Sequence, residues 1–205
     1  ASNTLNVKPL ISHKYLFEDA AKAYEKLIAD EYGLGILLDY GTAIKEQKIQ
    51  TIDLNKDQAF SEKLPIFGFI GAGNYASRIL IPAFKKCQAQ LNTLVNFSGV
   101  NSVVHGTRSG FAKASTDVEG MLEDKTINTV VIATKHDSHA DLAIQCLKAG
   151  KNVWIEKPIA LTFLQLELIE VELKKSINRS LKSGRRQQLM VGFNRRFSSQ
   201  VQKIK

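Results

Sequence analysis

The sequence has few cysteines and no long apolar run. Cys87 and Cys146 lie far apart and form no Cys-x-x-Cys pair, which argues against a disulfide framework or a zinc cluster. Each cysteine falls within a helical pattern, and we expect both to be small buried residues. The longest apolar stretches, such as residues 129–133 and 36–38, are far shorter than the roughly 20 residues of a membrane-spanning helix. The sequence therefore predicts no membrane span.

A secretory signal is also lacking, because no basic segment followed by an apolar core opens the chain. A cytoplasmic location is the expectation. With 44% hydrophobic and 23% charged residues, the composition is that of a globular protein and excludes fibrous and disordered classes. A chain of 205 residues can bury one good core with a small appendage.

Positive charge is in excess, with a formal net charge of +8, which suits a polyanionic partner. Much of this charge falls in one polar stretch without interleaved aromatic residues, which we interpret as a solvated loop. A dinucleotide phosphate also favours positive charge nearby, and we expect no nucleic-acid partner. The basic residues of the stretch are Lys174, Lys175, Arg179, Lys182, Arg185 and Arg186.

Residues 1–62 are expected to form a small N-terminal α/β appendage with a linker. Apolar residues at helical spacing predict a helix over 16–28, and the apolar run 35–40 predicts a buried strand. Residues 41–63 are polar and aperiodic, which indicates an irregular connection and a domain boundary near Glu62.

From Pro65 onward, short apolar runs alternate with helical patterns. This alternation is typical of a parallel sheet covered by helices on both faces, and right-handed crossovers make such a sheet doubly wound. Residues 63–193 are therefore predicted to form a Rossmann-type α/β domain. Strands are expected at 66–70, 93–97, 129–133, 152–155 and 189–193, and helices at 75–87, 103–114, 118–123, 138–149 and 163–176.

Two local signals refine these helices. Pro82 lies inside the helix expected over 75–87, and because a mid-helix proline costs about 3 kcal/mol, we expect a kink or a new helix start at Ile81 and Pro82. Thr162 and Gln165 have the spacing of a capping box at the start of the last helix.

A glycine-rich turn follows the first strand of the alternating region. Gly71 permits a tight turn, Gly73 lets the backbone approach a pyrophosphate, Ala76 keeps helix and strand close, and the helix N-terminus offers free N–H groups. The turn predicts binding of a nicotinamide dinucleotide, and a glycine turn without a ligand is the alternative. Its residues are Gly71, Ala72, Gly73, Asn74, Tyr75 and Ala76.

The end of the second strand bears on the choice of cofactor. An NAD-specific site carries an acidic residue about 20 residues after the turn, but residues 96–101 hold no acid; they include Ser98 and Asn101, and the nearest cation is Arg108. Small polar residues with a cation accommodate a 2′-phosphate, so NADP is favoured over NAD. Arg108 as a solvated helix residue is the alternative.

Chemistry is also expected at two further strand ends. Lys157 follows the strand 152–155, and its ammonium can polarise or protonate a substrate oxygen; an ordinary surface lysine is the alternative. His136 and His139 follow Thr134. Because no third ligand accompanies these histidines, we expect them to cap the helix and line the crevice rather than to bind a metal.

Residues 65–205 resemble the Gfo/Idh/MocA oxidoreductases. The resemblance implies an NAD(P)-binding Rossmann domain in which Lys157 is the active-site lysine beside the nicotinamide, with Thr134 and Glu156 near the cofactor. Many members of that family carry proline where this chain has Lys135, which affects the expected shape of the nicotinamide pocket. The matching residues are 68–76, 131–134, His139, 149–151 and Glu156, Lys157 and Pro158.

The resemblance also implies a second domain, an open antiparallel sheet with the catalytic His or Tyr and most sugar contacts. Residues 192–197 resemble the entry into that domain. We therefore expect residues 194–205 to begin a substrate domain that this chain lacks, and a homo-oligomer to form through it.

Residues 9–40 are similar to the closing segment of zinc-type alcohol dehydrogenases, at 10–15 and 20–24. The two resemblances together suggest a bi-domain oxidoreductase with an alcohol dehydrogenase-like half first. Such fusions often accompany bacterial surface polysaccharide synthesis, which suggests a nucleotide-linked sugar as substrate.

The leading hypothesis is hydride transfer between NAD(P) and a sugar-type alcohol or ketone, by a chain that alone binds cofactor without turnover. A non-catalytic NAD(P)-binding sensor or scaffold is the rival.

Overall fold

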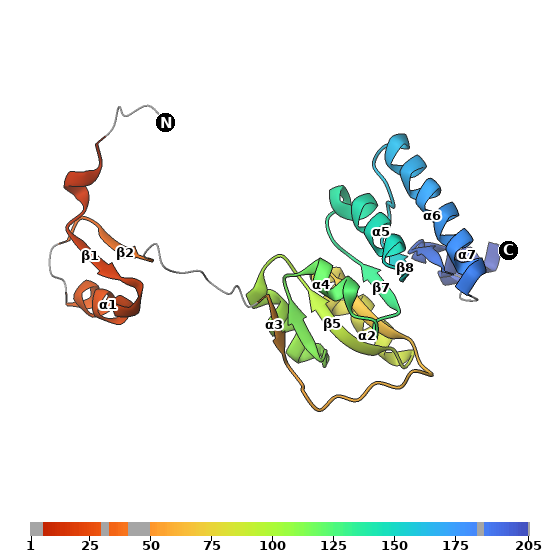
Figure 1. Ribbon diagram of the computed structural model, residues 1–205, viewed down its shortest axis with the longest axis horizontal. Coiled ribbons are helices and arrows are strands. Elements are labelled where there is room, and N and C mark those ends of the chain that lie inside the picture. Colours follow the sequence, from red (N-terminus) through yellow and green to blue (C-terminus); the bar gives the residue numbers. More distant parts are fainter. Residues whose placement is uncertain (1–5, 30–32, 41–49, 184–186, 205) are drawn as a thin grey trace. The chain divides into compact units, whose positions relative to one another are not determined.

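The computed structural model describes residues 6–29, 33–40, 50–183 and 187–204. Its elements fall into two compact units, one within residues 1–48 and the other within 49–205 (Figure 1). Among the helices of the described residues, none combines the length and the apolar content that crossing a membrane requires.

The first unit is a β-α-β arrangement. Strand β1 (His13–Leu16) and strand β2 (Ile36–Asp39) pair in parallel, and helix α1 (Ala20–Ile28) connects them. The sequence pattern predicted the helix from residue 16, but Leu16 has extended backbone angles and ends β1. Within the described part of this unit, Ala23 is the buried apolar residue, because two short strands and one helix enclose little volume.

The second unit is built on a sheet of seven strands, and the predicted doubly wound Rossmann-type fold is confirmed. Among the strands of the described residues in this unit, only the edge strand β3 is antiparallel to its neighbour. The spatial order is β3-β6-β5-β4-β7-β8-β9. The strands are β3 (Thr51–Asp53), β4 (Ile66–Ile70), β5 (Gln90–Val95), β6 (Lys113–Ser115), β7 (Thr129–Ile132), β8 (Asn152–Ile155) and β9 (Leu189–Val191).

The direction of winding reverses in the middle of this sheet. From β4 the chain runs outward through β5 to β6, then returns to the other side of β4 and continues through β7 and β8 to β9. At such a switch point the connections from neighbouring strands leave toward opposite faces, so a crevice opens beyond the carboxyl ends of the strands.

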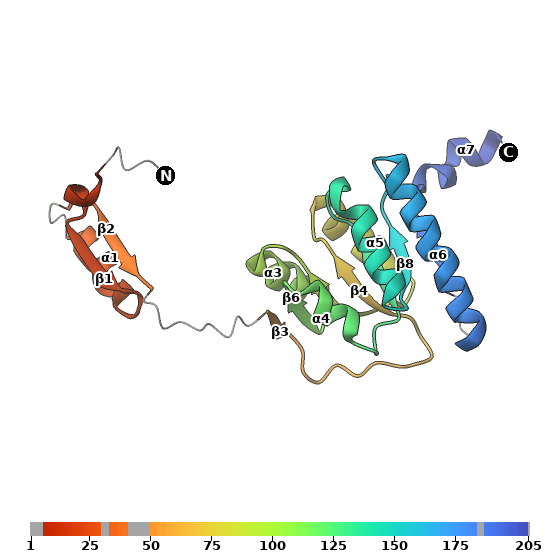
Figure 2. The ribbon, with the colours of Figure 1, turned by 45° about the horizontal axis from the view of Figure 1, so that its top comes forward.

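Helices cover both faces of the sheet. Helix α2 (Ile81–Lys86) and helix α3 (Gly99–Ser109) lie on one face, and α4 (Val118–Glu123), α5 (His139–Lys148) and α6 (Phe163–Ser183) lie on the other. Helices α5 and α6 lie side by side in both views of the ribbon (Figures 1 and 2). A short helix, α7 (Ser199–Ile204), ends the described chain.

Strand side chains alternate between two apolar layers, as a strand period of two requires. Along β4, Ile66 and Ile70 enter the cluster with α5, whereas Phe67 and Phe69 enter the cluster with α2. Gly68 faces α4, where a Cβ would lie 2.6 Å from the Met121 sulfur. Both faces of the central strands are therefore buried, which explains their continuous apolar runs.

The helix after β4 accommodates Pro82 as expected. A π-helical stretch covers Ala76–Leu80, in which the Ile81 N–H donates to the Ala76 carbonyl five residues earlier, and the α-helix α2 begins at Ile81. Proline lacks a donor and is tolerated in the first turn of a helix, so the predicted new helix start is confirmed. The Thr162–Gln165 capping box is also formed, with side chain and backbone bonds in both directions at 3.2 Å.

The boundary predicted near Glu62 is wrong, because the polar segment before it contains strand β3. Thr51 pairs with Ser115 and Asp53 with Lys113, and this pairing places the segment in the second unit. The tail of the helix expected over 103–114 is also a strand, β6. Helix α3 begins earlier than expected, because the Ser98 hydroxyl accepts from the Asn101 N–H at its start.

Two further expectations are corrected. The basic stretch is no loop up to residue 183, because α6 continues through Lys174, Arg179 and Lys182; Arg185 and Arg186 lie outside the described residues. Cys146 is buried as expected, and burial raises the pKa of its thiol to about 12. Cys87 is exposed, because it follows the last turn of α2.

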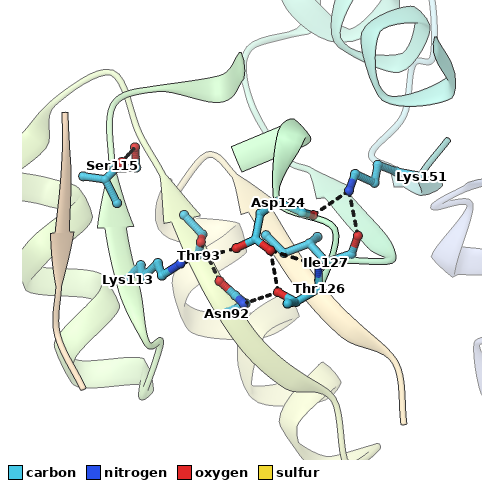
Figure 3. Close-up of polar contacts among 9 residues, drawn as sticks. Asn92, Thr93, Lys113, Ser115, Asp124, Thr126, Ile127 and Lys151 are labelled. Carbon is cyan, nitrogen blue, oxygen red and sulfur yellow. Dashed lines mark hydrogen bonds and ion pairs between the residues drawn. The ribbon is translucent and has the colours of Figure 1, made fainter. Parts of the chain in front are cut away.

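A polar network supports the amino-terminal end of the sheet (Figure 3). Lys151 is only 5% exposed, and its ammonium donates to the carbonyls of Asp124 at 2.7 Å and Ile127 at 2.8 Å. Burial lowers the pKa of Lys151. The Asp124 carboxylate accepts from the Thr126 hydroxyl at 2.6 Å and from the Lys113 ammonium at 3.3 Å.

The pKa of Asp124 lies below its ordinary value. Burial by itself raises the pKa of this carboxyl, but the two hydrogen bonds from Thr126 and the charge of Lys113 outweigh burial. Because the pKa is lower in the folded protein, the ionised carboxylate stabilises the fold at pH values above its unfolded-state pKa. This stabilisation is lost as the pH falls through the folded-state value.

Replacing Thr126 by valine tests this network. The variant removes the donor to Asp124 and the acceptor of the Asn92 amide, which is 2% exposed, so we expect a loss of about 1–3 kcal/mol of unfolding free energy at pH 7. Urea titrations should show a smaller deficit at a pH below the folded-state pKa of Asp124. The exposed Thr107→Val is the control, and an equal deficit at both pH values would contradict the electrostatic part of the explanation.

Candidate functional site

A cavity of about 840 Å³ opens at the carboxyl ends of β4, β5 and β7, where the winding direction reverses. The glycine-rich turn forms one wall, the segment after β5 a second, and the segment after β7 a third. The lining residues are Ile70, Gly71, Ala72, Gly73, Val95, Asn96, Phe97, Asn101, Thr116, Val118, Ala133, Thr134, Lys135, Asp137, Ser138 and Leu142.

Gly71 lies in close contact with both neighbouring strands. Its N–H donates to the Val95 carbonyl at 2.8 Å, its φ is +99°, and a Cβ built on it would lie 2.5 Å from the Ala133 carbonyl oxygen. An L-residue with a side chain is strained at this φ and collides with the backbone after β7. The position therefore requires glycine for reasons within the protein.

Gly73 has a different environment. It is exposed, and a Cβ on it would have no neighbour within 4 Å, so packing inside the protein does not require glycine here. The Ser77 N–H donates to the Gly73 carbonyl at 2.9 Å, which places Gly73 at the start of the helix. The first N–H groups of a helix have no intrahelical acceptor and bind anions. Gly73 therefore leaves its backbone accessible from the cavity.

The remaining residues of the turn divide by exposure. Asn74 and Tyr75 are exposed and already helical, whereas Ala76 is buried, as expected for a residue that keeps helix and strand close. The Tyr75 hydroxyl accepts from the Asn194 amide at 2.8 Å. None of these three residues lines the cavity itself.

The wall after β5 carries amides and an aromatic ring. Asn96 and Asn101 line the cavity, and Phe97 projects with its side chain fully exposed. Ser98, predicted to contact the cofactor, instead caps α3 and is absent from the lining. No carboxylate lies on this wall among the described residues; Asp137, on the wall after β7, is the acidic lining residue.

The prediction that Arg108 accommodates a 2′-phosphate is wrong. Arg108 is exposed in the last turn of α3, whose first turn lies at the cavity. At about 1.5 Å per residue, the helix carries Arg108 roughly 15 Å away from Ser98. The alternative, a solvated helix residue, describes Arg108 correctly.

The wall after β7 is held by short hydrogen bonds. The hydroxyls of Thr134 and Ser138 lie 2.7 Å apart, and Ser138 donates to the Lys135 carbonyl at 2.8 Å. Lys135 and Asp137, opposite in charge, are both lining residues of this wall. In the described residues, no group of three or more His, Cys, Asp or Glu side chains is placed to hold a metal ion.

The two histidines do not line the cavity as expected. His136 is exposed, and its ring centroid lies 5.6 Å from that of His139. His139 is 0% exposed, with Nδ1 2.7 Å from the Pro158 carbonyl and Nε2 3.2 Å from the Thr134 carbonyl. Both ring nitrogens of His139 face backbone oxygens, so its side chain is not available to a cofactor in this conformation.

Lys157 lies one strand away from the cavity wall. Strands β7 and β8 pair Thr129 with Asn152 and Ile132 with Ile155, so Thr134 and Lys157 each lie two residues beyond the last paired position of neighbouring strands. Lys157 is exposed, and its N–H donates to Glu156 Oε2 at 3.1 Å. The other carboxylate oxygen of Glu156 is buried without a hydrogen-bond partner. An acceptor with free capacity therefore lies beside Lys157.

Residues 66–181, more than half of the chain, match the family described as an oxidoreductase family with an NAD-binding Rossmann fold. The chain belongs to the Gfo/Idh/MocA oxidoreductase family. The Rossmann domain and its nicotinamide dinucleotide cofactor, predicted from the glycine turn and the Glu156, Lys157 and Pro158 motif, are confirmed at the level of the family.

Among the relatives in this family, oxidoreductase P35 of Formosa agariphila is 32% identical over 111 residues, which cover 54% of this chain and 35% of P35. Myo-inositol 2-dehydrogenase of Thermotoga maritima is 32% identical over 96 residues, covering 47% of this chain and 26% of that enzyme. The chain thus spans about a third or less of the length of these two relatives.

A solved structure shares the fold at lower identity. The WlbA dehydrogenase of Chromobacterium violaceum, whose structure holds NADH and UDP-GlcNAcA, superposes with a TM-score of 0.62 at 20% identity. The match covers 71% of this chain and 40% of that chain. At this identity the likeness concerns the fold alone.

Several lining residues were missed by sequence reasoning. Asn96 and Phe97 directly follow β5, and Lys135 and Asp137 lie one and three residues after the motif residue Thr134. The rule that ligands meet strand carboxyl ends could therefore have identified them. Thr116 follows β6, which the sequence pattern assigned to the end of a helix, and no local signal marked it.

The contrast between Gly71 and Gly73 gives a prediction. Gly71→Ala should lower the unfolding free energy by more than about 1 kcal/mol, because it adds strain and a collision. Gly73→Ala should fold like the wild type but bind dinucleotide at least about tenfold more weakly, because its methyl enters the space next to the helix N-terminus. Urea unfolding and calorimetric titration with NADPH and NADH measure the two effects. Unaltered affinity in Gly73→Ala, or wild-type binding of neither cofactor at millimolar concentration, would contradict the assignment.

Proposed function

We propose that this chain is the dinucleotide-binding part of an enzyme that transfers hydride between NAD(P) and a sugar-type or nucleotide-sugar alcohol or ketone. The single observation that carries the proposal is the parallel pairing of β7 with β8, because it places the end of β8, two residues before Lys157, beside the end of β7, two residues before the cavity residue Thr134.

The cavity fits a dinucleotide in size and chemistry. Gly73 leaves open space at the start of a helix, where backbone N–H groups attract a pyrophosphate. Phe97 offers an exposed aromatic surface on one wall, and Thr134 and Lys135 offer polar groups on another. The turn would hold the phosphates, and Asn96 and Asn101 would lie near the ribose that distinguishes NAD from NADP.

A bound nicotinamide supplies a carbon that accepts or donates hydride. Lys157 is exposed at the strand end, where its ammonium can donate a proton to a substrate oxygen or its neutral amine can accept one. Glu156 accepts from the Lys157 N–H and so restrains the backbone that carries the lysine. The unpartnered oxygen of Glu156 is buried, so it would accept from a cofactor or substrate group only after the segment around it moves.

The substrate class is inferred from the relatives. The relatives include a myo-inositol 2-dehydrogenase, and the WlbA dehydrogenase was crystallised with UDP-GlcNAcA, which supports a polyhydroxylated substrate. The other expectations of the sequence stay predictions: an alcohol dehydrogenase-like half before the family domain, residues 194–205 as the start of a substrate domain, a homo-oligomer, a cytoplasmic location, no nucleic-acid partner and a role in polysaccharide synthesis.

Asn96 tests the preference for NADP. An aspartate at this position would repel a 2′-phosphate and accept hydrogen bonds from the free ribose hydroxyls of NAD. We expect Asn96→Asp to change the ratio of the NADPH and NADH dissociation constants by at least about tenfold in favour of NADH. Thr107→Asp adds the same charge at the far end of α3 and should leave the ratio unchanged. An unchanged ratio in both variants would mean that Asn96 does not face the ribose.

Lys157 tests the catalytic role, in the full-length protein assayed with inositols and UDP-sugars. Lys157→Met should lower kcat at least about a hundredfold, because it removes proton transfer, and should leave the NADPH dissociation constant within about threefold of wild type. Lys148→Met, at the exposed end of α5, is the matched control. Unchanged turnover after loss of Lys157 would favour the rival hypothesis, a non-catalytic NAD(P)-binding sensor or scaffold.

A further inference from the structure

We propose that His139 is a positioning residue, which ties the segment carrying Lys157 to the cavity wall carrying Thr134. The effect of His139 on the chemistry of Lys157 rests on the proposed function, whereas the contact between the His139 ring and the Pro158 segment does not. The His139 side chain is polar and fully buried, and it lies where the backbone pairing of β7 and β8 ends.

The backbone ladder between β7 and β8 stops before the functional residues. Its last hydrogen bond joins the Glu156 N–H to the Ile132 carbonyl at 3.0 Å. Beyond that bond the chain after β7 turns into the short helical segment before α5, and the chain after β8 continues through Lys157 to Pro158. Thr134 and Lys157 therefore lie on two diverging segments that the sheet no longer holds together.

The His139 ring joins the segment after β8 to the start of α5, the helix that follows Thr134. Nδ1 lies 2.7 Å from the Pro158 carbonyl, directly after Lys157, and Nε2 lies 3.2 Å from the Thr134 carbonyl. The shorter contact assigns the ring proton to Nδ1, which donates to Pro158, so Nε2 keeps a lone pair and makes no hydrogen bond to the Thr134 carbonyl. The connection to the wall of Thr134 runs through Ser138, directly before His139, whose hydroxyl lies 2.7 Å from that of Thr134. The ring stands on the first residue of α5, so it is anchored by a helix that packs on the same sheet.

Packing alone does not explain a histidine at this position. The ring is 0% exposed, and a buried polar group costs free energy unless its atoms are hydrogen-bonded. Leucine or phenylalanine would fill the same volume without that cost. The Nδ1–H bond to the Pro158 carbonyl, on the segment that carries Lys157, therefore accounts for the choice of residue.

Three variants separate the bridge from general stability. His139→Phe keeps ring volume but removes both polar atoms. His139→Asn keeps a donor near the Nδ1 position, whereas His139→Gln places its amide nearer to Nε2. The matched control is Cys146→Ala, which truncates another side chain that is 0% exposed on the same helix, seven residues after His139, and that has no hydrogen-bonding role toward Pro158 in the core cluster.

The experiment uses the isotope-labelled chain without cofactor, followed by titration with NADPH. We expect a slowly exchanging ring N–H signal that is lost in His139→Phe, together with shifted amide signals of Thr134 and Lys157. His139→Phe should weaken NADPH binding about five- to tenfold, and His139→Asn should restore it to within about twofold of wild type. Cys146→Ala should lower the unfolding free energy while leaving the amide signals and the affinity unchanged.

The outcomes distinguish this proposal from the proposed function. Wild-type amide signals at Thr134 and Lys157 in His139→Phe, or equal shifts in Cys146→Ala, would overturn the bridge. If the Phe variant does not fold, the comparison of His139→Asn with His139→Gln decides. Equal NADPH affinities of these two variants would overturn the bridge through Pro158. If the wild-type chain shows the ring N–H signal but binds no dinucleotide, and His139→Phe still shifts the amide signals of Thr134 and Lys157, the result would contradict the proposed function and leave the bridge intact.

Discussion

The close approach of the backbone at Gly71 to the strands on either side is the constraint on which the crevice depends. Its N–H is bonded to the Val95 carbonyl at the end of β5, and its missing side chain admits the Ala133 carbonyl after β7. Both neighbours are thereby fixed against the turn at the place where the winding reverses. The helix N-terminus at Gly73 then opens onto the cavity and not onto a packed strand.

The two ends of the sheet have different roles because polar groups at one end have hydrogen-bond partners within the protein and some polar groups at the other end have none. At the amino-terminal end, Lys151, Asp124 and Thr126 satisfy one another with hydrogen bonds, which stabilises the fold. At the carboxyl end, Lys157 is exposed and one oxygen of Glu156 has no partner. Groups left with free hydrogen-bonding capacity are those that can act on a ligand.

Much of the fold was predictable, and the errors share a physical cause. The strand 66–70 and the helix start at Ile81 follow from local chemistry, namely an apolar run and a proline without a donor. Strand β3 was missed because its three residues, Thr51–Asp53, are exposed at the edge of the sheet and are too few to show an alternation of apolar and polar side chains. Only their pairing with β6 identifies them as a strand. The length of α6 was underestimated because a basic surface helix and a basic loop have similar composition.

The sequence by itself determined the parallel sheet, the glycine turn and the family motif around Lys157, because backbone conformation and apolar periodicity are local properties. Only the tertiary structure decided which side chains reach the cavity. It carried Arg108 away along α3, turned His139 into the space between two strand ends, and brought Asn96, Phe97 and Lys135 to the cavity walls. The direction of a side chain depends on which neighbouring strand or helix packs beside it, and that information is spread over residues far apart in the chain.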